Sequence, residues 1–176
     1  MCMKKGLIQI YTGRGKGKTT AAVGQAIRGL GHGVKVCFVY FFKVPSEHGY
    51  GEFKVLEDLG VKVRGFAKKH PDFFKEVSPE NAREQSLKGL KFVEKIFEDS
   101  FDMVVLDELI VALRDEFLKE EEVLELLEKK PEETEVILTG RGATSTLMDN
   151  ADLVSKIEKV KHPYDEGIES REGVEF

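Results

Sequence analysis

The chain has 176 residues, of which 41% are hydrophobic and 34% are charged, and this composition predicts one domain spanning residues 1–176. Its 32 acidic residues outnumber its 27 basic ones, so the net charge of -5 argues against a nucleic-acid-binding or membrane-binding surface. The longest apolar stretch, around residues 36–42, is far shorter than the roughly 20 residues of a membrane span. Only Cys2 and Cys37 occur, so we expect no disulfide framework and a cytoplasmic location.

Apolar runs alternate with helix-like segments along the whole chain. The patterns predict strands at 7–11, 34–41, 61–66, 103–106, 136–138 and 153–160, and helices at 19–30, 53–59, 79–97 and 123–128. The second strand is hydrophobic at nearly every position, which is typical of a strand covered on both faces, and we expect it to be central. The alternation predicts an α/β domain with a parallel sheet.

The segment TGRGKGKTT, residues 12–20, follows the first predicted strand and opens the first predicted helix. Its glycines let backbone N–H groups turn toward phosphate oxygens, Lys18 can neutralise phosphate charge, and the Thr19 hydroxyl can bind Mg²⁺. Thr12 stands where the usual pattern has glycine, and Gly13 follows it. A flexible turn with solvated lysines is the weaker interpretation. The loop predicts a three-layer phosphate-loop nucleotide-hydrolase-like α/β fold, recombinase-like, with a mostly parallel central sheet.

Charged residues follow three other predicted strands. Asp107 and Glu108 end the apolar run MVVL and can meet Mg²⁺ beside the phosphate loop, although a turn or a helix cap is an alternative. Arg141 follows the strand at 136–138 and can clamp an anion, or can be an ordinary surface arginine. Lys43 can reach phosphate or substrate, but a solvated strand-end lysine is slightly favoured for it.

Other kinds of chemistry lack a pattern in this sequence. The four histidines and two cysteines do not have metal-ligand spacing, although His162 offers a titratable imidazole near the C-terminus. There is no G-x-S-x-G element. The sequence therefore predicts neither a zinc site nor covalent catalysis by the protein.

Five segments, in this order, resemble the corrinoid adenosyltransferases, which act on ATP and cob(I)alamin: TGRGKGKTTAA, VYFFK, VVLDEL, ILTGRGA and VKHPYDEGIESREGVEF. The resemblance runs nearly end to end, and the family's loop T-G-x-G-K-G-K-T has the same displaced glycine. It implies that Mg²⁺ with ATP binds in the loop, in an orientation reversed from that of ordinary phosphate-loop hydrolases. A reduced Co(I) corrinoid then attacks the ribose C5′ carbon and triphosphate leaves. The resemblance also implies a homodimer, and a flavoprotein is a candidate reductant.

The same resemblance assigns residues to roles. It implies nucleotide contacts from Gly13, Arg14, Gly15, Lys16, Gly17, Lys18, Thr19, Thr20, Lys43 and Arg141. It gives the magnesium site to Thr19, Asp107 and Glu108, and catalytic roles to Lys18, Phe66 and Glu108. Phe66 matches an aromatic residue that the family uses against the corrin to favour four-coordinate cobalt. Enteric members read G-F-x-W where this chain has Lys68, so a second aromatic wall is missing unless Phe73 or Phe74 replaces it.

Two other functions are consistent with these patterns. In a phosphate-loop ATPase or nucleotide-dependent binding module, Asp107 binds Mg²⁺ and Glu108 activates water. In a corrinoid carrier or ATP sensor, Lys68 in place of the aromatic residue weakens transfer. The products of ATP distinguish these hypotheses, because only adenosyl transfer releases triphosphate in step with corrinoid consumption.

Overall fold

The computed structural model describes residues 5–45 and 49–174, and its elements follow one another in βα order. The strands are β1 (Ile8–Thr12), β2 (Val36–Phe41), β3 (Lys62–Phe66), β4 (Met103–Asp107), β5 (Glu135–Thr139) and β6 (Leu153–Lys156). The helices are α1 (Lys18–Leu30), α3 (Gly51–Asp58), α4 (Pro79–Glu98), α5 (Leu109–Arg114), α6 (Glu120–Glu128) and α7 (Ser145–Asp149), with a 3₁₀ helix η1 (Pro163–Glu166) near the C-terminus.

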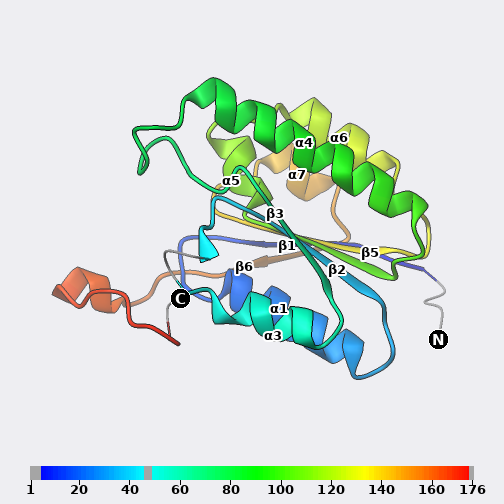
Figure 1. The fold of residues 1–176 in the computed structure, drawn as a ribbon, viewed down its shortest axis with the longest axis horizontal. Coiled ribbons are helices and arrows are strands. Elements are labelled where there is room, and N and C mark those ends of the chain that lie inside the picture. Colours follow the sequence, from blue (N-terminus) through cyan, green and yellow to red (C-terminus); the bar gives the residue numbers. More distant parts are fainter. Residues whose placement is uncertain (1–4, 46–48, 175–176) are drawn as a thin grey trace.

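The strands form one six-stranded sheet in the order β3-β2-β4-β5-β1-β6, and every neighbouring pair is parallel. Helices α1 and α3 cover one face and α4 to α7 cover the other, which gives three layers (Figure 1). The predicted α/β class is therefore confirmed, with a sheet that is wholly parallel. Because parallel strands end at the same edge, the loops after β1, β2, β4 and β5 gather there.

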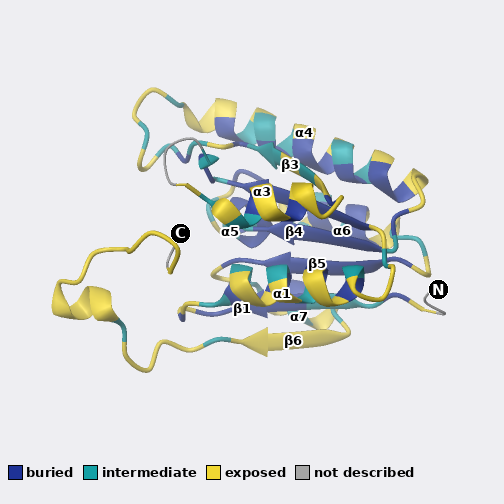
Figure 2. Cartoon of the chain, turned by 60° about the horizontal axis from the view of Figure 1, so that its bottom comes forward, coloured by how far each residue is buried: buried dark blue, intermediate teal, exposed yellow. Residues whose placement is uncertain are grey.

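Burial explains the sequence pattern of the strands. Every residue of β2, β4 and β5 is buried, whereas every residue of β6 is exposed at the end of the sheet (Figure 2). β2 lies inside the sheet as expected, one place from the edge strand β3. None of the helices in the described ranges has the length and apolar character of a membrane span.

Two helices were not predicted and several boundaries differ; for example, α6 begins at Glu120 and not at residue 123. Helix α5 follows β4 almost directly, and its apolar sequence LIVALR extends the strand's hydrophobic run, so periodicity could not separate them. Helix α7 is only five residues long. Strand β6 ends at Lys156 and not near Val160, because pairing with β1 ends at Thr12. The predicted start of α4 is confirmed, since the Ser78 hydroxyl accepts the Asn81 N–H at 3.2 Å.

Helix α4 packs closely on the sheet at Gly89. A Cβ atom built at Gly89 would lie 2.6 Å from the ring of Phe41, which is fully buried in β2. Glycine is an unfavourable residue inside a helix, so its presence here reflects the close contact and not helix propensity. Gly24 of α1 is the opposite case, because a Cβ atom built there would meet no atom of a neighbouring element within 4 Å.

We predict that Gly89→Ala lowers the free energy of unfolding by about 1–3 kcal/mol, because the buried ring must shift to admit the methyl group. The matched control Gly24→Ala is expected to raise it by up to about 1 kcal/mol, through helix propensity alone. Urea unfolding of both variants measures the difference. A Gly89→Ala protein as stable as the wild type would show that the contact is not tight.

Candidate active site

The phosphate loop has a backbone that only glycine accommodates easily. Gly13 and Gly17 have φ values of 103° and 119°. A Cβ atom at Gly13 would also lie 2.3 Å from the Ile157 carbonyl oxygen, and the Gly15 N–H donates to that same oxygen at 2.7 Å. The segment after β6 therefore packs directly against the loop and shapes it.

Thr12 explains the displaced glycine. It is the last residue of β1, it is buried, and its hydroxyl accepts the Ala143 N–H at 3.3 Å. Position 12 therefore belongs to the sheet, and the glycine-dependent turn begins one residue later at Gly13.

Lys18 is the first residue of α1, and its side chain folds back into the phosphate loop. Its side chain is buried, and its ammonium donates to the Gly15 carbonyl at 2.8 Å. Burial lowers the pKa of Lys18, and the positive charge of Arg141 lowers it further, whereas Glu108 opposes the shift. The ammonium thus lies inside the loop, with one of its three N–H donors bound to Gly15.

Asp107 connects the elements of this edge. It is fully buried at the end of β4, and its Oδ1 accepts the hydroxyls of Thr19 at 2.9 Å and Thr139 at 2.6 Å. Its Oδ2 accepts the Lys43 ammonium at 2.6 Å, and Lys43 also donates to the Thr19 hydroxyl at 3.0 Å. The expected meeting of Asp107 with the phosphate-loop threonine is confirmed.

The preference for a solvated Lys43 was wrong. The residue is only 7% exposed, and its ammonium lies 5.2 Å from the Tyr50 ring centroid and 5.6 Å from that of Phe53. Phe42, with a φ of 52°, turns the chain after β2. Burial disfavours the charge on Lys43, but Asp107 overcomes this effect and raises the pKa of Lys43. The lysine is therefore a buried cation, which the sequence could not reveal.

Glu108 is the adjacent carboxylate and is less constrained. It has a left-handed backbone, with φ of 59°, and its N–H donates to the Thr139 hydroxyl at 3.0 Å. It precedes α5 at the cap position without a side-chain cap bond, so its carboxylate is not used as a helix cap. Burial and the nearby Asp107 charge raise the pKa of Glu108, against the attraction of Lys43 and Lys18.

The remaining predicted residues lie around this centre with different exposure. Arg141 follows β5 and is exposed, yet its charge reaches both Lys18 and Glu108. Arg14, Lys16 and Thr20 are also exposed. These side chains are accessible to a ligand at the carboxyl edge of the sheet.

The oxygen ligands present suit a hard cation that arrives with phosphate. Thr19 and Glu108 offer a hydroxyl and a carboxylate. The Thr19 hydroxyl donates to Asp107 and accepts from Lys43, and both oxygens of Asp107 accept protein donors. Within 5–45 and 49–174, no group of three or more His, Cys, Asp or Glu residues could hold a metal ion. Mg²⁺ commonly needs only one or two side chains when phosphates and water complete its coordination.

Phe66 lies apart from these charged groups, on the α4 side of the sheet. Its half-buried ring at the end of β3 has centroid distances of 6.4 Å to Phe41 and 5.4 Å to Phe92. Of the two candidate replacements for the missing aromatic wall, Phe73 is 81% exposed, and the Phe74 ring centroid lies 4.7 Å from the Lys69 ammonium. Phe92, one turn of α4 beyond Lys88, is the aromatic neighbour that the sequence analysis missed.

The loop after Phe66 is held by a buried histidine that no sequence pattern indicated. His70 Nε2 lies 2.9 Å from Asp115 Oδ2, and His70 Nδ1 accepts the Asp72 N–H at 3.2 Å. His162 has a comparable local role, because its Nδ1 accepts the Tyr164 N–H at 3.2 Å at the start of η1. Both imidazoles therefore organise backbone turns.

Comparison with known proteins points to one family. The family model described as ATP:corrinoid adenosyltransferase BtuR/CobO/CobP matches residues 4–176. The corrinoid adenosyltransferase of Escherichia coli strain K12 is 37% identical over 174 residues, which cover 98% of this chain and 87% of that protein. The corrinoid adenosyltransferase of a Sinorhizobium species is 36% identical over 182 residues, covering 98% and 81%. Corrinoid adenosyltransferase CobA of Salmonella typhimurium is 37% identical over 175 residues, covering 98% and 87%.

We predict that Lys43→Met lowers the free energy of unfolding by about 3 kcal/mol, because it leaves the buried Asp107 carboxylate without its cation. The double variant Lys43→Met/Asp107→Asn is expected to recover part of that loss. Lys54→Met, on the exposed surface of α3, is the control and is expected to change stability by less than about 0.5 kcal/mol. An unchanged urea midpoint for Lys43→Met would contradict the pairing.

Proposed function

This chain belongs to the ATP:corrinoid adenosyltransferase family, and we propose that its phosphate loop and the Asp107 cluster form the ATP site of that activity. The protein transfers the 5′-deoxyadenosyl group of ATP to the Co(I) centre of a reduced corrinoid and releases triphosphate. The observation that carries the assignment of the site is the hydrogen bond between phosphate-loop Thr19 and fully buried Asp107.

The reaction requires no nucleophile or base from the protein. Co(I) supplies the electron pair of the new bond to C5′, and the C5′–O bond breaks with its electron pair leaving on triphosphate. The protein therefore has to align the two substrates, exclude water and stabilise charge on the departing triphosphate. A site made of cations and oriented N–H groups supports that role.

We propose that the triphosphate is held by the loop residues and by two cations from other strands. The full set is Gly13, Arg14, Gly15, Lys16, Gly17, Lys18, Thr19, Thr20, Lys43 and Arg141. Lys18 is the catalytic cation in this proposal, because its buried ammonium lies inside the loop. Lys43 adds a second positive charge 3.0 Å from the Thr19 hydroxyl.

Mg²⁺ bound with ATP fits the oxygen donors of this site. We propose that Thr19 and Glu108 hold the ion, while Asp107 orients the Thr19 hydroxyl that it accepts at 2.9 Å. When bound, Mg²⁺ neutralises charge on the triphosphate leaving group. Glu108 acts as a ligand and not as a base for water.

For the corrinoid we propose that Phe66 contacts the macrocycle and helps to displace its lower axial ligand. The ring is half-buried at the carboxyl end of the edge strand β3, which leaves part of its surface available. Phe92 packs beside it at 5.4 Å and supports its position.

The wider setting is also a proposal. We place residues 1–176 in one domain that works as a homodimer, and exposed Leu153, Val154 and Val160 along and after β6 are apolar surface that a partner subunit could cover. Co(I) is readily oxidised, which favours a reducing cytoplasm and a flavoprotein as the electron donor. Burial raises the pKa of Cys37 to about 12, consistent with an unreactive packing thiol, while Cys2 lies outside the described residues.

The assigned function predicts stoichiometric formation of a light-sensitive Co–C product and triphosphate from Mg²⁺-ATP and chemically reduced cob(I)alamin under anaerobic conditions. Lys18→Ala is expected to reduce transfer at least about 100-fold, because a buried charge facing the triphosphate is lost. Lys54→Ala is the control, and thermal melting checks that both variants fold. Unchanged transfer by Lys18→Ala would refute the site, and ADP formation independent of corrinoid would favour the ATPase.

The raised pKa of Glu108 predicts a distinctive pH dependence of Mg²⁺-ATP binding. Its carboxylate takes up a proton at a higher pH than an exposed glutamate, so affinity should begin to fall at a higher pH during acidification. Glu108→Gln is expected to bind Mg²⁺-ATP more weakly and to lose the part of the pH dependence that comes from protonation of Glu108. Titration calorimetry of both proteins at several pH values separates the effect of Glu108 from the titration of ATP itself. Parallel pH curves for the two proteins would argue against Glu108 as a ligand.

A further inference from the structure

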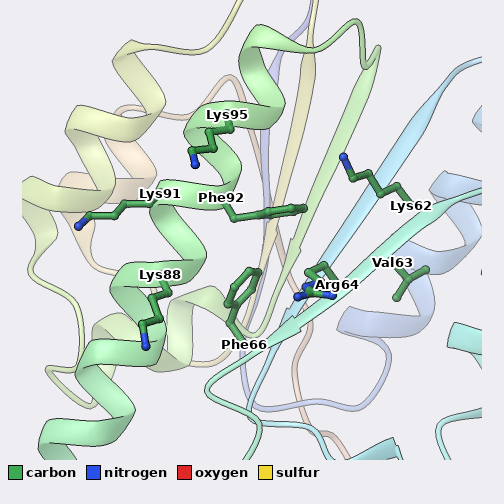
Figure 3. Close-up of a pocket in the computed structure, with 8 residues that line it drawn as sticks. All are labelled: Lys62, Val63, Arg64, Phe66, Lys88, Lys91, Phe92 and Lys95. Atoms are coloured by element: carbon green, nitrogen blue, oxygen red, sulfur yellow. The ribbon is translucent and has the colours of Figure 1, made fainter.

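A cationic pocket of about 440 Å³ lies between β3 and α4, away from the phosphate loop (Figure 3). It is lined by Lys62, Val63, Arg64, Phe66, Lys88, Lys91, Phe92 and Lys95. Five of these residues are basic and none is acidic, although the whole chain has a net charge of -5. The positive charge is therefore concentrated locally.

The periodicity of two elements produces this surface. From the edge strand β3 come the alternate residues Lys62, Arg64 and Phe66, together with Val63. From α4 come residues at positions i, i+3, i+4 and i+7, namely Lys88, Lys91, Phe92 and Lys95. Each element thus contributes basic side chains and one phenylalanine ring to the pocket.

The protein neutralises these cations only in part. Lys88 pairs with Glu84 at 2.7 Å, and Lys62 lies 3.6 Å from Asp99, in exposed pairs of small energetic value. Across the described part of the chain, no carboxylate lies within ion-pair distance of Arg64, Lys91 or Lys95. Like charges gathered in this way repel one another, and an anionic ligand would relieve that repulsion.

The pocket also has an apolar component. The Phe66 and Phe92 rings lie 5.4 Å apart, and the Lys62 ammonium is 5.5 Å from the Phe92 centroid. A second hollow, of about 290 Å³, shares Phe66 and adds Lys68 and Lys69 to its lining. Phe66 is therefore an aromatic surface between two hollows, with basic side chains on both sides.

We propose that this cationic groove, defined by the residues lining the first pocket, selects corrinoids whose rim carries negative charge. The inference rests on the proposed contact of Phe66 with the macrocycle. The acetate and propionate arms of a corrinoid are either free carboxylates or neutral amides, and some corrinoids carry a phosphate in a nucleotide loop. A macrocycle on Phe66 brings such arms near Arg64 and Lys88, and a guanidinium binds carboxylate or phosphate through paired hydrogen bonds.

A second copy of the chain that docks groove to groove is a poor occupant, because two identical cationic grooves repel each other. An acidic protein that docks here is a different proposal, and the experiment below separates the two by using a chemical reductant.

The test compares kcat/KM for adenosylation of three chemically reduced corrinoids. The first has free carboxylate arms, the second has all arms amidated and no nucleotide loop, and the third has a phosphate-containing loop. Arg64→Gln/Lys88→Gln removes charge from the groove. Lys54→Gln/Arg28→Gln removes one lysine and one arginine from exposed positions on α3 and α1, which cover the opposite face. Thermal melting of both variants checks the fold.

We expect the groove variant to lose about tenfold in kcat/KM for an anionic corrinoid and less than about twofold for the amidated one, with no such difference in the control. Salt should reduce the discrimination of the wild type, because exposed charges are screened. A loss confined to the carboxylate form identifies the arms, and a loss confined to the loop-containing form identifies the phosphate.

Equal effects on all three corrinoids, or none, would overturn the inference while leaving the adenosyltransferase function intact. A loss that appears only with a protein reductant would also overturn it, in favour of protein docking. Absence of adenosylation by the wild type with every corrinoid would instead overturn the proposed function on which the inference rests.

Discussion

The carboxylate of Asp107 is the group on which the arrangement of this site depends. Burying a charge is costly unless cations and hydrogen-bond donors surround it, so Asp107 requires Lys43, Thr19 and Thr139 in fixed positions. Those donors come from α1, β5 and the turn after β2. The contacts that compensate this burial therefore also bring together, at one edge of the sheet, groups that we propose bind phosphate and Mg²⁺.

A second constraint joins the phosphate loop to the end of the chain. The backbone at Ile157 and Glu158 lies so close to Gly13 and Gly15 that a side chain at either glycine would collide with it. Only Lys159 separates these two residues from the segment 160–176 that resembles the family's C-terminal motif. Glycine is thus required in the loop for two reasons: the backbone at Gly13 has a positive φ, and a distant segment packs too closely to leave room for a side chain.

The surfaces proposed for the two substrates differ in chemistry and come from different elements of the fold. The proposed ATP site consists of polar groups at the carboxyl edge, where the loops after β1, β2, β4 and β5 meet. The aromatic surface of Phe66 and the cationic groove belong to the edge strand β3 and to α4. An edge strand leaves room beside it, so a large planar substrate can approach without displacing a neighbouring strand.

The sequence by itself determined the strand and helix alternation, the phosphate loop and its partner Asp107, because local motifs and buried apolar runs record these features directly. It also carried the near end-to-end family resemblance. Only the tertiary structure decided that Lys43 is a buried cation, that Phe92 neighbours Phe66, and that Gly13 must admit the Ile157 backbone. These facts depend on contacts between segments far apart in the chain. Burial and proximity of that kind arise from the packing of whole elements and leave no local pattern.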